Sequence, residues 1–126
     1  MNRRSGEQWV ALAASVEVVT GLVVIIRPSL FGRLLFGAQF SSPGQALGRL
    51  TGFTLLSLAL ACWPGLGTER RSAVRALLVF SLLSAIYLVY LGAGSGLVGP
   101  LLWPAAALHA ALAILLAFSW LRRSQR

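Results

Sequence analysis

Four apolar stretches fill most of this 126-residue chain, and only short segments separate them. The stretches cover residues 9–26, 44–64, 76–91 and 101–120. A helix needs about 20 residues to cross hydrocarbon about 30 Å thick, which is close to the length of each stretch. Because backbone groups in lipid must be hydrogen-bonded within the segment, helices are predicted. The sequence therefore predicts an all-α integral membrane four-helix bundle, with a single transmembrane domain over residues 1–126.

The charged residues flank the apolar stretches. The chain has 11 basic residues, all of them arginine, and 3 acidic ones, which gives a net charge of +8. A nucleic-acid-binding surface would need a basic stripe interleaved with exposed aromatic residues, and the sequence has no such stripe. We therefore expect no nucleic-acid partner. The arginines are instead expected to orient the spans and to contact lipid headgroups, each worth about 1 kcal/mol near the membrane surface.

The arginines are distributed unevenly between the two sides of the predicted membrane. The first connection carries Arg27 and Arg33, and the third connection, residues 92–100, carries none. All eight arginines in the two tails and the second connection fall on the other side: Arg3, Arg4, Arg70, Arg71, Arg75, Arg122, Arg123 and Arg126. The positive-inside rule then predicts that both termini are cytoplasmic.

Aromatic residues predict the same topology. Trp9, Trp63 and Trp120 fall at the predicted cytoplasmic ends of three spans, and Tyr90 and Trp103 fall at outer ends. Tryptophan and tyrosine prefer the depth of the headgroups. Two patterns of different physical origin therefore agree.

The first connection contains a segment that is apolar but too short to span. It runs from Pro28 to Gly37. Proline suits the first turn of a helix and glycine suits its end, so a short interfacial helix on the outer leaflet is predicted. The functional alternative is a lid over a site that opens outward.

Glu17 is the only acidic residue within a predicted span, and it lies near the middle. A carboxylate at that depth is costly unless it is protonated, paired or hydrated. The residues on its helical face are mostly small: Val10, Ala13, Ala14, Thr20, Gly21 and Val24. Small residues allow close helix contacts, so Glu17 is expected to point into the bundle.

Other polar residues fall in the outer half of the predicted bundle. A rise of 1.5 Å per residue puts Arg49 within reach of Glu17, because a long arginine side chain can extend along its helix. The candidates for a shared polar pocket are Glu17, Arg49, Tyr87, His109, Gln45 and Thr51, with Ser84 as a further member. Two interpretations remain open: a structural pair that sets helix register, and a site for a ligand, quinone or proton.

Several kinds of chemistry find no support in the sequence. The single cysteine, Cys62, lies in an apolar run and is expected to be a packing residue. One histidine makes no metal site, so no metal and no cofactor are expected. There is no nucleophile–base pair and no phosphate-binding loop, so the protein is not expected to be an enzyme.

Three segments carry a resemblance to a family. Thr20–Gly21, Pro28 through Gly37, and Leu47 through Gly52 resemble the small DoxX-like bacterial membrane proteins. The resemblance implies a four-helix bundle in the inner membrane of a bacterium, and some members of that family are thought to be accessory to quinone-linked oxidation. It marks Arg49 and its neighbouring glycines as a family feature without a catalytic role.

A second resemblance is architectural. Residues 13–18 look like the first helix of small multidrug resistance transporters, which exchange a proton for a cationic drug at a glutamate in the membrane. The leading expectation is an accessory or scaffold subunit, or a binder of quinone or lipid, with the polar pocket described above. The alternative is a proton-coupled transporter that uses Glu17. The expected partners are membrane lipids, together with a larger membrane complex or further copies of the chain.

Overall fold

The computed structural model describes residues 3–65 and 69–124, which form five helices and no strand. They are α1 (Arg3–Ile26), α2 (Pro28–Phe36), α3 (Ser42–Cys62), α4 (Arg70–Gly94) and α5 (Leu102–Ser124). Four of them are long and apolar enough to cross a membrane, over Gly6–Ile26, Ser42–Cys62, Arg70–Gly94 and Leu102–Arg122. The prediction of an all-α chain with four such helices is confirmed.

The helices are longer than some of the apolar stretches that predicted them. The largest difference is at α4, which begins at Arg70, whereas the apolar stretch begins at residue 76. Arginine is a good helix former, so the helix continues through Arg70, Arg71 and Arg75. Hydropathy marks the part of a helix that suits lipid, and it does not mark where the helix ends.

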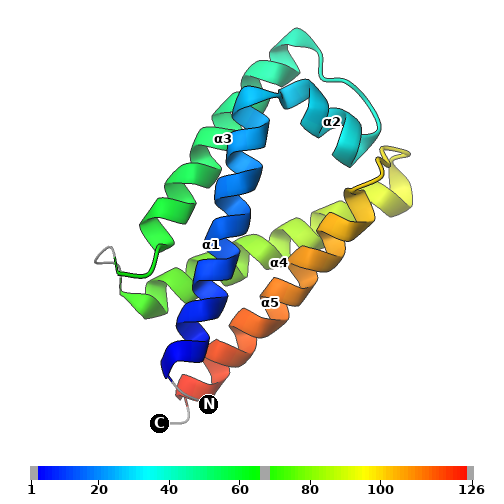
Figure 1. Cartoon of the computed structure of the whole chain (residues 1–126). Helices are drawn as coiled ribbons and strands as arrows, with labels where there is room; N and C mark the ends of the chain where they lie inside the picture. The colour runs from blue at the N-terminus through cyan, green and yellow to red at the C-terminus, as the bar shows by residue number, and fades with distance from the viewer. Residues whose placement is uncertain (1–2, 66–68, 125–126) are drawn as a thin grey trace.

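The long helices associate as two pairs. Helix α1 runs alongside α3, and α4 runs alongside α5 (Figure 1). The first turn of α1 and the last turn of α5 lie at one end of the molecule, called here the terminal end, and α2 lies at the other, called the α2 end. The two pairs contact each other much less than the helices within each pair do.

Close approach within the first pair depends on two glycines. A Cβ atom on Gly52 would lie 2.7 Å from the carbonyl oxygen of Gly21, and one on Gly21 would lie 2.9 Å from the carbonyl oxygen of Gly52. The two backbones therefore meet at these positions, as expected for small residues at a helix contact in a membrane. This contact sets the register of α1 against α3.

The core that joins the two pairs lies toward the terminal end. Its buried residues come from α1, α3, α4 and α5, and we call them the first core cluster: Val10, Ala13, Cys62, Ala73, Val74, Leu77, Leu112 and Leu116. Cys62 is a free thiol within this cluster, so its prediction as a packing residue is confirmed.

At the α2 end, the short helix connects the two pairs. It begins with Pro28 and ends at Gly37, whose φ of 71° is left-handed, so the predicted helix over this segment is confirmed. The loop before α5 docks on its last turn: Gly99 N–H donates to the carbonyl of Leu35 (3.0 Å), and Leu101 N–H donates to that of Leu34 (2.8 Å). Carbonyls at the end of α2 are thereby satisfied by the other helical pair.

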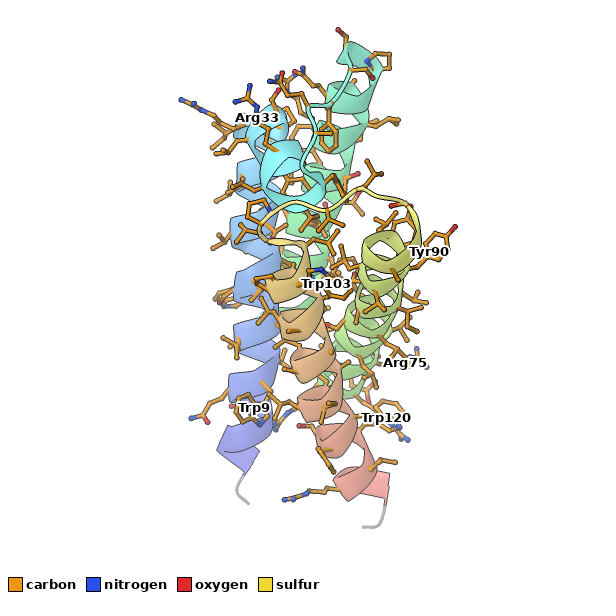
Figure 2. The ribbon with its side chains drawn as sticks, turned by 90° about the vertical axis from the view of Figure 1, so that its right-hand side faces the viewer. Trp9, Arg33, Arg75, Tyr90, Trp103 and Trp120 are labelled. Atoms are coloured by element: carbon orange, nitrogen blue, oxygen red, sulfur yellow. The ribbon has the colours of Figure 1, made fainter. Side chains whose placement is uncertain are left out.

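The aromatic residues expected at the membrane surfaces lie in two groups along the long axis of the molecule. Trp9 and Trp120 lie near the terminal end, whereas Tyr90 and Trp103 lie toward the α2 end, with Arg33 (Figure 2). Of the arginines expected together on one side, the side chains of Arg3, Arg4, Arg123 and Arg126 lie outside those that the structure describes.

Candidate functional site

Glu17 lies inside the molecule with 1% of its surface exposed. Its neighbours along the same face of α1 are also buried, namely Ala13, Ala14, Gly21 and Val24. Small residues on this face let α3 approach α1 closely, at Gly21 and Gly52. The prediction that Glu17 points into the interior is therefore confirmed.

The carboxyl group of Glu17 has no hydrogen-bonding partner and no counter-ion among the described residues, and its Oε1 is fully buried. The expected partner, Arg49, is exposed, and its Nε donates to the carbonyl oxygen of Ile25 at 3.3 Å. The Gly21–Gly52 contact explains this, because it places Arg49 beside the last turns of α1, about 12 Å along the helix from Glu17. The two residues do not form the expected pair.

Ser81 and the half-buried His109 each have a buried polar atom without a hydrogen bond. Ser81 on α4 is 1% exposed and its Oγ has no hydrogen bond, and the Nδ1 of His109 on α5 is likewise buried and unbonded. Ser81 is the serine among the described residues that combines a buried hydroxyl with the lack of a hydrogen bond. The hydroxyls of Ser15, Ser57, Ser95 and Ser119 each donate to the carbonyl four residues earlier, which is the common way to satisfy a serine in a helix.

Each of these three side chains lies about one turn from a member of the first core cluster. Glu17 lies one turn beyond Ala13, Ser81 lies one turn beyond Leu77, and His109 lies one turn before Leu112, all toward the α2 end. Ala13, Leu77 and Leu112 belong to one contiguous cluster. We call Glu17, Ser81 and His109 the buried polar layer. Three helices thus each bring one unsatisfied polar atom into the interior, just past the core that joins the two pairs.

The remaining expected site residues lie outside this layer. Thr51 Oγ1 donates to the carbonyl of Leu47 (2.9 Å), and Gln45 Nε2 donates to that of Phe40 (3.4 Å). Tyr87 is 59% exposed and stacks on Tyr90, with ring centroids 6.2 Å apart. Of the six residues expected in one polar pocket, only Glu17 and His109 have a buried polar atom without a partner.

Ser81 was missed by the sequence reasoning, which named Ser84 instead. The two serines lie on different faces of α4, and Ser84 is half-buried. Ser81 falls on the buried stripe formed by Leu77, Ala85 and Leu88. That stripe has helical spacing, so a comparison of the faces of this helix could have identified the serine.

A separate pocket of about 350 Å³ lies at the terminal end. It is lined by residues at the beginning of α1, the end of α3 and the beginning of α4, including Val10, Cys62 and Trp63. An ion pair between Arg70 Nη1 and Glu7 Oε1 (3.3 Å) lies at its edge. Such a partly exposed pair contributes little to stability. The pocket does not include any residue of the buried polar layer.

Comparison with known proteins assigns no family. No family model, no curated protein and no solved structure matches the chain. The class of the protein therefore rests on its four apolar helices, which suggest a multi-pass membrane protein. Among the described residues there is no group of three or more His, Cys, Asp or Glu side chains that could hold a metal ion.

Proposed function

We propose that this protein is a small proton-coupled transporter in which Glu17 binds a proton and a small organic cation alternately. The observation that carries the proposal is the burial of Glu17, which is 1% exposed and has a fully buried Oε1, without a counter-ion among the described residues. An ionisable group inside a membrane protein is expensive, and such groups mark ion and proton pathways. The finding that Arg49 bonds elsewhere removes the cation that would compete with a cationic substrate.

The buried polar layer supplies the chemistry for this exchange. A proton neutralises the carboxyl group of Glu17 when no substrate is bound, and a cation takes the place of the proton. The Oγ of Ser81 can donate or accept a hydrogen bond, and the Nδ1 of His109 can do either according to its tautomer. Both are buried without a partner, so both are available to a proton or to the polar part of a substrate.

The arrangement of the helices supports movement of one pair against the other. Contacts are extensive within α1–α3 and within α4–α5, and sparse between the pairs. The pairs meet in the first core cluster and again where α2 docks on the loop before α5. Transporters commonly expose a central site alternately by rocking one rigid unit against another. The buried polar layer lies between these two connections.

We further propose that the chain resides in a bacterial inner membrane, with both termini in the cytoplasm and α2 at the outer surface. Arg70, Arg71, Arg75 and Arg122 at the terminal end support this orientation through the positive-inside rule. A phosphatase reporter that works only outside the cytoplasm is expected to be inactive when fused after Arg126 and active when inserted near Gly96. The reverse pattern of activities would invert the proposed topology.

Proton release tests the proposed function directly. Addition of a quaternary ammonium compound to the detergent-solubilised protein in weak buffer is expected to release about one proton per bound cation. The variant Glu17→Gln is expected to release none, because an amide has no proton to exchange at neutral pH. The matched control is Glu7→Gln, which changes an exposed carboxylate at the terminal end and is expected to behave as the unmodified protein does. Equal release from the Glu17→Gln variant would contradict the proposal.

A second candidate function is supported by the outer surface of the α2 half. Arg49 and Tyr87 are exposed there, and an arginine on the outside of a span is unusual unless a partner or a headgroup covers it. These side chains suit a DoxX-like accessory subunit, or a binder of quinone or lipid. Absence of proton release, together with co-purification of the chain with a larger membrane complex, would favour this second function.

A further inference from the structure

A pair of arginines on α4 lies beside an aromatic residue of α5 at the terminal end. The guanidinium carbon of Arg71 is 5.0 Å from the centre of the Trp120 ring. Arg75 lies one turn farther along the same face of α4 and is exposed, without a hydrogen bond or ion pair among the described residues. In Figure 2, Arg75 and Trp120 lie along the same edge of the molecule. Two helices thus build a basic and aromatic surface, called here the α4–α5 basic surface.

This surface has the chemistry of a phosphate site. Guanidinium groups bind phosphate oxygens through two parallel hydrogen bonds, and residues one turn apart on a helix lie about 5–6 Å from each other. Arg71 and Arg75 can therefore hold one phosphate between them. The Trp120 ring restricts Arg71, so less side-chain freedom is lost when the anion binds.

The surface continues into an apolar stripe on the same face of α4. Val79, Leu82 and Ile86 follow Arg75 at helical spacing and are 50%, 49% and 59% exposed. A free anion gains no binding energy from such an apolar stripe, whereas the acyl chain of a lipid can pack along it. Tryptophan at the end of a span is also typical of headgroup depth.

We propose that the α4–α5 basic surface is a binding site for an anionic phospholipid. Its phosphate lies between Arg71 and Arg75, beside Trp120, and an acyl chain lies along Val79, Leu82 and Ile86. Arg70, next to Arg71 in the chain, pairs instead with Glu7 of α1. The site does not depend on the proposed transport function, nor on which side of the membrane the terminal end faces.

The test uses the full chain, purified and delipidated in an uncharged detergent. The shift in melting temperature is measured as phosphatidylglycerol, phosphatidylcholine or inorganic phosphate is added, and an apparent affinity is taken from each titration. We expect phosphatidylglycerol to stabilise the protein, and the other two to have little effect. The double variant Arg71→Gln/Arg75→Gln is expected to bind phosphatidylglycerol about 25-fold more weakly, since each arginine near a headgroup contributes about fivefold.

The matched control is Arg27→Gln/Arg33→Gln, which removes two exposed arginines at the α2 end. Its affinity is expected to stay within about threefold of the unmodified protein. An equal loss in both double variants would overturn the proposal, because only total charge would then matter. Equal stabilisation by phosphatidylcholine would overturn it too, and equal stabilisation by inorganic phosphate would identify a site for free anions.

A further pair of substitutions covers the case in which the glutamine variant does not fold. Arg71→Lys/Arg75→Lys keeps both charges but loses the planar groups that bind phosphate through two bonds. We expect this variant to bind phosphatidylglycerol several-fold more weakly than the unmodified protein. An unchanged affinity would show that the arginines do not hold the phosphate.

Discussion

The substitution Glu17→Met is expected to stabilise the protein by about 1–3 kcal/mol and to abolish proton release at the same time. A buried polar group without a partner loses its hydration and regains nothing inside the molecule. Methionine has a similar length, is flexible, and fills the same space with apolar atoms. The carboxyl group therefore reduces stability, and we expect it to be required for activity.

Unfolding by an ionic detergent, followed in mixed micelles, measures the first effect, and the proton-release assay measures the second. The control is the same substitution at Glu7, which is exposed and pairs with Arg70 at 3.3 Å. Loss of such a pair is expected to destabilise the protein by no more than about 1 kcal/mol. If Glu17→Met instead destabilised the protein by several kcal/mol, the carboxyl group would have a structural partner and the proposed site would be wrong.

The substitution Gly52→Leu is expected to destabilise the protein by about 2–3 kcal/mol, because it separates α1 from α3. A Cβ atom at this position would lie 2.7 Å from the carbonyl oxygen of Gly21 and 2.6 Å from Cγ1 of Ile25. Since the carbonyl oxygen of Gly21 belongs to the backbone of α1, this contact can be relieved only if α1 moves away from α3. Because the same contact sets the level of Glu17 and Arg49, proton release is expected to fall as well.

Gly94 provides the matched control for this substitution. It also lies in a helix, and a Cβ atom there would have no neighbour within 4 Å. Leucine is a better helix former than glycine, so Gly94→Leu is expected to leave stability unchanged or to raise it by less than about 1 kcal/mol. Similar losses at both positions, measured by thermal unfolding in detergent, would show that the α1–α3 contact is not as close as described.

Polar side chains within the helices differ in whether their hydrogen bonds are made locally. The hydroxyls of Thr51 and Thr54 donate to carbonyls of their own helix, and they add nothing to the interior between the pairs. Glu17, Ser81 and His109 lack such local partners. An unsatisfied polar atom is costly in a low-dielectric interior, and the proposed function rests on these three atoms.

The sequence by itself was sufficient to predict the features that depend on local chemistry. Apolar composition predicted the four long helices, since backbone groups in lipid require helices. Pro28 and Gly37 predicted the bounds of α2 because one suits the first turn and the other adopts a left-handed φ. The small residues around Glu17 predicted that this side chain points inward, because the face of a helix follows from its spacing.

Only the tertiary structure decided which residues of different helices lie at the same level. Depth estimates from each helix end placed Arg49 near Glu17, but the contact between Gly21 and Gly52 shifts Arg49 to the carbonyl of Ile25. The same holds for Ser81, which joins the buried polar layer because Leu77, one turn away, packs in the first core cluster. The physical reason is that register depends on where two backbones approach each other, and that contact joins residues far apart in the chain.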